Sequence, residues 1–231
     1  MIIIMPLISY SIYISQLYFG LVRESYLLYV YVIVPLIFIA YCIKRFFEYY
    51  NKRKKLRLGY DGEVAVGQEL NQLMRNGYYV YHDFPANGFN IDHIVIGPAG
   101  VFAVETKGRR KSLTGNAKAE ARVVYDGESL KFPKWTETRP LEQAKNQAEW
   151  LARFLAKAVG DHVEVMPVLF LPGWFVERIS KNGIPVLSNL KGFNFLLKNN
   201  VLSENMIKRI AHQVEQKCRD TEPMISVEFR A

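Results

Sequence analysis

Two carboxylates and a lysine lie on two strand-like segments that surround a tight turn. Asp92 precedes the turn segment Gly97-Pro98-Ala99-Gly100, and Glu105 and Lys107 follow it. If the segments pair as a hairpin with Gly97 opposite Gly100, Asp92 faces Glu105. The Cβ atoms of directly opposed residues lie about 5 Å apart, and the strand period of two places Lys107 on the same face as Glu105. The spacing therefore predicts that these three side chains converge.

The other residues on this face of the hairpin are apolar, so the carboxylates stand at the end of a stripe that faces the core. These apolar residues are Ile94, Ile96, Val101 and Ala103. Opposed like charges destabilise a sheet, and a partly buried carboxylate needs compensation. A Mg²⁺ ion supplies it, because Mg²⁺ is often held by one or two carboxylates plus phosphates. Lys107 alone also supplies it, as a structural salt bridge, and the spacing leaves both alternatives open.

Three sequence blocks place this pair of acids in a wider pattern. They are GYDGEVAVGQEL, FNIDHIVIGPAGVFAVETKG and PLEQAKNQAEWL, in this order. Together they resemble the nuclease-related domain (NERD) over roughly residues 59–150. Asp92, thirteen residues before Glu105-Thr106-Lys107, with Glu63 on a preceding helix, is similar to the PD-(D/E)XK nuclease superfamily. Ile91 stands where the nominal pattern of that superfamily has proline.

The resemblance implies a divalent metal site, with Mg²⁺ or Mn²⁺ as the cofactor. Asp92 and Glu105 would ligate the ion, and the backbone carbonyl of Thr106 would be a further ligand. Glu63 would complete the acidic site from the first helix, directly or through a metal-bound water. An acidic residue in a first helical turn is also what the helix dipole favours, so Glu63 has a purely structural interpretation as well.

The resemblance also assigns roles to a lysine and a glutamine. Lys107 would orient or activate the attacking water and stabilise the charge that develops on the phosphate. Gln143 would support the site from the following helix, although an exposed helix residue explains it equally. The run Arg109-Arg110-Lys111 just beyond the site is expected to contact phosphates, or to be a solvated loop.

Two histidines near the acids do not fit a known metal-ligand spacing. His82 and His93 belong to no recognisable His/Cys pattern, and His93 lies on the face opposite Asp92 if the strand is regular. We expect both to have structural or surface roles.

The elements that must position these residues follow from hydrophobic periodicity and turn signals. The pattern predicts a helix that begins after Asp61 and ends before Gly77, a buried strand over 163–171, and a long helix over 141–159 that Pro140 opens. Shorter strands are expected at 78–84, 122–125, 129–132 and 184–187, and closing helices at 192–197 and 203–217. With the resemblance, the expected fold class is α/β, a restriction-endonuclease-like mixed sheet flanked by helices.

The amino-terminal part is strongly apolar. Residues 25–43 are nineteen residues without a charge, which is close to the ~20 that a helix needs to cross a bilayer. Residues 3–22 are a second candidate span, with the hairpin turn at Arg23-Glu24. The expected organisation is a transmembrane anchor over 1–46, a basic linker over 47–58 and a NERD domain over 59–231.

Most of the net charge of +8 lies just after this apolar region. Seven basic residues and Glu48 fall between Lys44 and Arg57, so the rest of the chain is nearly neutral. Basic residues that follow a span stay on the cytoplasmic side, and they attract anionic lipid. These patterns predict a protein at the cell membrane, with a bilayer partner and a cytoplasmic domain. The two distant cysteines, Cys42 and Cys218, are typical of a reducing compartment.

The sequence therefore predicts a membrane-anchored, metal-dependent nuclease that hydrolyses phosphodiester bonds, in DNA rather than RNA. The alternative is a non-catalytic module of the same fold that binds nucleic acid or acts as a scaffold. In a third interpretation the acids are structural and the partner is a protein, and the near-neutral charge of the domain favours it. A homo-oligomer stays open.

Overall fold

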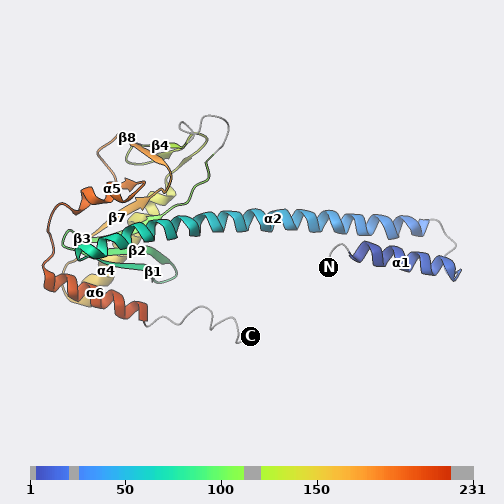
Figure 1. The fold of residues 1–231 in the computed structure, drawn as a ribbon, viewed down its shortest axis with the longest axis horizontal. Coiled ribbons are helices and arrows are strands. Elements are labelled where there is room, and N and C mark those ends of the chain that lie inside the picture. The colour runs from blue at the N-terminus through green and yellow to red at the C-terminus, as the bar shows by residue number, and fades with distance from the viewer. Residues whose placement is uncertain (1–3, 21–25, 112–120, 220–231) are drawn as a thin grey trace. The chain divides into compact units, whose positions relative to one another are not determined.

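The computed structural model describes residues 4–20, 26–111 and 121–219, except for the side chains of residues 4–7 and 26–32 (Figure 1). The chain forms two compact units, Met1–Arg57 and Leu58–Ala231. The predicted turn at Arg23-Glu24 and residues 220–231 lie outside the described residues.

The first unit is helical. It contains α1 (Ile4–Tyr18) and most of α2 (Tyr26–Leu70), which continues across the unit boundary into the second unit. Residues 47–58, expected to be a basic linker, belong to α2. Asp61 therefore lies inside a helix instead of at its start.

The predicted membrane anchor is wrong. Among the residues that the structure describes, no helix combines the length and the apolar character needed to cross a bilayer. Helix α1 has 15 residues, about 22 Å at ~1.5 Å per residue, against a hydrocarbon core of about 30 Å. The predicted spans over 3–22 and 25–43, and the localisation at the cell membrane that depended on them, are corrected accordingly.

The second unit is built on a five-stranded mixed sheet. Its strand order is β1-β2-β3-β7-β9, antiparallel from β1 to β3 and parallel from β3 to β9. The strands are β1 (Tyr79–Pro85), β2 (Asn90–Gly97), β3 (Gly100–Thr106), β7 (Val165–Phe170) and β9 (Val186–Leu187). The expected mixed sheet flanked by helices is confirmed.

Helices cover both faces of this sheet (Figure 1). On one face, α4 (Arg139–Val159) and α6 (Glu204–Arg219) pack on β1, β2 and β3 through a core that includes Ile94, Leu151 and Ile210. On the other face lie the end of α2, the 3₁₀ helix η1 (Asn71–Asn76) and α5 (Leu190–Asn194), which is followed by the 3₁₀ turn η2 (Phe195–Leu197). Burial of apolar area between these layers stabilises the fold.

A second, four-stranded sheet combines three strands between β3 and α4 with one strand after β7, and sequence reasoning found only its first hairpin. Its order is β6-β5-β4-β8. The strands are β4 (Arg122–Tyr125), β5 (Leu130–Lys131), β6 (Thr136–Glu137) and β8 (Phe175–Arg178). The predicted pairing around Asp126-Gly127 is confirmed, since Tyr125 pairs with Leu130.

Helix α4 forms where the sequence predicted a helix, and it is the element that covers the site. Pro140 occupies the first turn, where its missing N–H costs no hydrogen bond, and Gly160 closes the helix in the left-handed conformation. Its buried positions recur every three or four residues, including Ala144, Gln147 and Leu151. Gln147 is a polar side chain on this apolar face, which points to a specific partner inside the protein.

Candidate functional site

The hairpin of β2 and β3 has the predicted register. Ile96 pairs with Val101 and His93 with Val104, so the ladder runs toward Asp92 and Glu105 without a bulge. At its end, the backbone N–H of Thr106 donates a 2.7 Å hydrogen bond to Oδ2 of Asp92. Both acids therefore stand at the same end of the hairpin.

Glu105 is fully buried and has two partners of different kinds. Its Oε2 accepts a 2.6 Å hydrogen bond from Nε2 of Gln147, and its Oε1 forms an ion pair with the ammonium of Lys107. Lys107 is partly exposed, so its ammonium lies between the buried carboxylate and solvent. A charge-assisted contact of this kind compensates part of the cost of burying Glu105.

Two further carboxylates, Glu63 from α2 and Asp83 from β1, line a pocket with Asp92. The pocket has a volume of about 280 Å³. Asp83 occupies the ladder position opposite Asp92, between the pairs His82–His93 and Phe84–Ile91. Its φ of 51° lies in the left-handed region, where a non-glycine residue is uncommon. Asp83 is thus a fourth acid of the site, and no spacing signal in the sequence identified it.

The electrostatics of the acids reflect their proximity. Burial, followed by the charge of Glu105, raises the pKa of Asp92 to about 7, against the lowering effects of the Thr106 N–H and Lys107. Burial and the charge of Asp83 also raise the pKa of Glu63. The positive charge of Lys107 therefore does not balance the acids that surround it.

Two glycines allow α2 to approach the end of β3. A Cβ on Gly108 would overlap the backbone carbonyl of Leu58, and a Cβ on Gly62 would lie 3.5 Å from Cα of Gly108. This close approach holds Glu63, the neighbour of Gly62, beside Lys107. The sequence signal for Glu63 was its place on a preceding helix, and the glycine contact explains how that helix reaches the site.

The glutamine that touches the acids is Gln147, one helical turn after Gln143. Gln143 lines a pocket of about 290 Å³ together with Lys107, Arg109 and Arg139, and its support of the site stays a prediction. Gln147 was not singled out from the sequence. Its spacing of four from Gln143 on one helix face was the available signal.

The three residues of the basic run beyond the site have different surroundings. The guanidinium of Arg109 forms two hydrogen bonds to Glu137, at 2.8 and 2.9 Å, and its carbonyl accepts from the indole N–H of Trp174. Arg110 is exposed, and Lys111 lies near Gly173. The expected phosphate contacts therefore fit Arg110 better than Arg109.

The two histidines form a pair packed against α2. Nδ1 of His82 lies 2.8 Å from Nδ1 of His93, and Nε2 of His82 lies 3.0 Å from Oδ1 of Asn71. Both rings sit near Gly67, where a Cβ would meet them at 3.2 and 3.3 Å. Burial lowers the pKa of both histidines, that of His93 to about 4. A neutral pair that connects the hairpin to α2 matches the expected structural role.

The carboxylate oxygens of the site are the kind of ligand atom that a divalent cation such as Mg²⁺ or Mn²⁺ takes. Asp92 and Glu105 offer carboxylate oxygens close together, and burial, followed by the charge of Glu105, raises the pKa of Asp92. Within the described part of the chain, no three His, Cys, Asp or Glu side chains are gathered closely enough to hold a metal ion by themselves.

The comparison with protein families agrees with this geometry. Residues 58–172 match the model of the nuclease-related domain. The matched region begins in α2 before Glu63 and ends after β7, so it contains all the acids described above. No curated protein and no solved structure gives a match. The chain therefore carries a nuclease-related domain and belongs to the NERD family.

Proposed function

We propose that this protein is a metal-dependent nuclease that hydrolyses phosphodiester bonds in DNA. The observation that carries the proposal is the convergence of Asp92, Glu105 and Lys107 at the end of the β2–β3 hairpin, with Glu63 brought beside them by α2. Membership of the NERD family supports the same reaction class.

Asp92 and Glu105 would hold the divalent cation, Mg²⁺ or Mn²⁺, with the carbonyl of Thr106 as a further ligand. When bound, such an ion polarises a phosphoryl oxygen and lowers the pKa of a coordinated water. Thr106 orients Asp92 through its backbone N–H, and Gln147 orients Glu105 through its side-chain amide.

Lys107 would act on the substrate from the partly exposed side of Glu105. Its ammonium can move from the carboxylate to a phosphate oxygen that enters the same space, where it stabilises developing negative charge. It lines a pocket with Arg139 and Gln143, which gives the phosphodiester a route to the acids.

The test uses the purified full chain, incubated with linear, circular and single-stranded DNA and with RNA in Mg²⁺ or Mn²⁺. Asp92→Asn and Lys107→Ala remove the carboxylate and the ammonium of the site. The matched control is Lys208→Ala, because Lys208 forms an exposed ion pair with Glu204 on α6. We expect cleavage that needs the metal, survives in the control and falls by at least about a hundredfold in both site variants.

Two results would contradict the proposal. If the folded chain binds the metal and nucleic acid but cuts nothing, the domain is a binding or scaffolding module. If Asp92→Asn changes neither metal binding nor cleavage, the acids are a structural cluster that Lys107 neutralises.

A further inference from the structure

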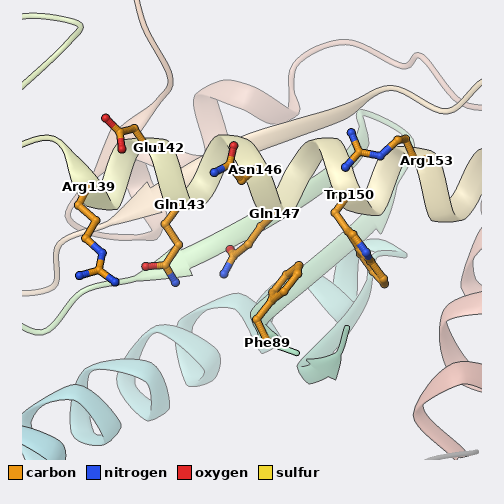
Figure 2. A pocket seen from close by; sticks show the side chains of 8 residues that line it. All are labelled: Phe89, Arg139, Glu142, Gln143, Asn146, Gln147, Trp150 and Arg153. Atoms are coloured by element: carbon orange, nitrogen blue, oxygen red, sulfur yellow. The ribbon is translucent and has the colours of Figure 1, made fainter. Parts of the chain in front are cut away.

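A further pocket opens along α4, and no assigned role accounts for it. It has a volume of about 600 Å³ and is drawn in Figure 2. Arg139, Gln143, Gln147 and Trp150 extend from one side of α4, and Phe89 reaches toward Trp150 from the connection between β1 and β2. Gln147 also donates to Glu105, so one lining residue of this pocket contacts the candidate catalytic site.

One wall of the pocket is aromatic and firmly supported. The rings of Phe89 and Trp150 meet edge to face with centroids 5.6 Å apart, and Trp150 stacks on Phe154 at an interplanar angle of 3°. Phe84, which is fully buried, contacts both Trp150 and Phe154. Phe89 keeps 37% of its surface exposed at the rim. Aromatic rings fixed in this way are platforms on which a planar ligand stacks.

A buried amide lies in the wall of the pocket. Gln147 is 2% exposed, and its Nε2 donates both to Glu105 and to the carbonyl of Asn90, which fixes the orientation of the amide. Among the described residues, none forms a hydrogen bond with its buried Oε1. A buried amide oxygen of this kind is costly unless a donor reaches it.

Two guanidinium groups line opposite ends of the pocket. Arg139 is shared with the pocket that contains Lys107, and Arg153 lies one helical turn beyond Trp150. Arg153 is 66% exposed, and its contact with Glu149 is long, at 3.9 Å. Guanidinium groups bind phosphates through paired N–H donors. The pocket thus offers an aromatic surface and phosphate donors along α4.

We infer that this pocket binds an unpaired nucleotide next to the scissile bond, and that the substrate is single-stranded there. The inference deepens the proposed function and rests on it for the position of the cut. The base stacks on one of the rings of Phe89 and Trp150 and meets the other at its edge, and Arg153 contacts a phosphate beside it. Arg139 contacts a phosphate further along the strand. Stacking on these rings requires an exposed base face, which a base inside a duplex lacks.

The test measures binding without cleavage. The full chain is titrated into fluorescein-labelled oligothymidylate, and into a blunt duplex of equal length, in EDTA so that no metal is present. The aromatic variants are Trp150→Leu, with Trp150→Phe as the conservative rescue, and Phe89→Leu. Trp135→Leu is the aromatic control. Trp135 has the same exposed fraction as Phe89, 37%, and it stacks on Phe132 between β5 and β6 of the second sheet.

A second pair of variants tests the phosphate contact. Arg153→Ala is compared with Arg219→Ala on α6, because each arginine is about two thirds exposed and pairs with a glutamate four residues earlier. The affinity of each variant is measured over a series of salt concentrations. Thermal unfolding of every variant shows whether it is folded.

The expected result is a single-strand preference that depends on the pocket. Trp150→Leu and Phe89→Leu should each weaken oligothymidylate binding about tenfold, whereas Trp150→Phe and Trp135→Leu retain it. Arg153→Ala should reduce the log–log salt slope by about 0.7, and Arg219→Ala should leave it unchanged. If this pattern holds and no substrate is cut, the pocket inference stands and the proposed nuclease function fails.

The inference is overturned if folded Phe89→Leu and Trp150→Leu bind oligothymidylate as the parent does. It is also overturned if the blunt duplex binds as tightly as the single strand. In either case, metal-dependent cleavage that Asp92→Asn abolishes would leave the proposed function intact.

Discussion

Gln147 and Glu105 form a fully buried amide–carboxylate hydrogen bond of 2.6 Å. Replacing Gln147 with Leu keeps the volume and removes the donor, so Glu105 retains only its ion pair with Lys107. We expect the free energy of unfolding to fall by about 1–3 kcal/mol, because a buried carboxylate loses a hydrogen bond. Urea unfolding measures the change.

The control for this variant is Gln143→Leu, one turn earlier and only partly buried. Its free energy of unfolding should stay within about 0.5 kcal/mol of the parent value. Equal losses of unfolding free energy in the two variants would show that the hydrogen bond to Glu105 does not itself stabilise the fold.

The raised pKa of Asp92 predicts a pH dependence of stability in the absence of metal. Because its pKa of about 7 in the folded state exceeds the ordinary aspartate value, the folded chain binds a proton that the unfolded chain releases. This contribution is present at low pH and is lost as the pH rises toward 7, and it amounts to about 4 kcal/mol. Asp92→Asn should remove it and stabilise the metal-free protein at neutral pH.

The measurement compares the stability of the parent with that of Asp92→Asn at each pH, because His93 also contributes to the pH dependence. The lowered pKa of His93 has the opposite effect, since that contribution is lost as the pH falls toward 4. Thermal unfolding in EDTA between pH 4 and pH 8 gives both curves, with the exposed Asp161→Asn as the control. Parallel curves for parent and Asp92→Asn would contradict the prediction.

Gly108 is predicted to be essential for the contact between α2 and the end of β3. Alanine there would overlap the carbonyl of Leu58, which is backbone and cannot rotate away. We expect Gly108→Ala to lower the free energy of unfolding by about 1–3 kcal/mol, the range found for overpacking, and to displace Lys107. The control is Gly59→Ala, where the added Cβ meets nothing within 4 Å and should stabilise the helix slightly.

Arg109 and Arg110 are predicted to differ although they are neighbours. The guanidinium of Arg109 is held by Glu137, so Arg109→Ala should lower stability by about 1 kcal/mol and change the salt dependence of nucleic-acid binding little. Arg110 is exposed, and Arg110→Ala should reduce the salt slope by roughly one without loss of stability. Salt titrations of both variants decide this, and a larger slope change for Arg109→Ala would reverse the assignment.

Local pattern was sufficient for the hairpin that carries the chemistry. The turn segment Gly97–Gly100 and the alternation on both sides fix the register, which is why Asp92 and Glu105 stand at one end of it. Helix α4 was also predictable, since Pro140 and the spacing of its apolar residues mark its start and its buried face. These features depend on residues close together in the sequence.

Composition alone was insufficient to predict the amino-terminal helices. An uncharged run indicates a bilayer span only if the helix has the required length, and α1 has 15 residues. The start of the helix predicted after Asp61 was wrong, because α2 continues through Asp61 to Leu70 without a break. Where a helix begins and ends depends on its packing as well as on its capping residues.

The sequence by itself determined the hairpin, the meeting of Asp92, Glu105 and Lys107 at its end, and the family resemblance that the comparison confirmed. Only the tertiary structure decided that Gln147 contacts Glu105, that Asp83 joins the acids and that Phe89 meets Trp150. The physical reason is how far apart in the sequence the contacting residues lie. Strand pairing around a short turn is dictated by neighbours in the chain, whereas contacts between α4, β1 and β3 depend on how the layers pack across the core.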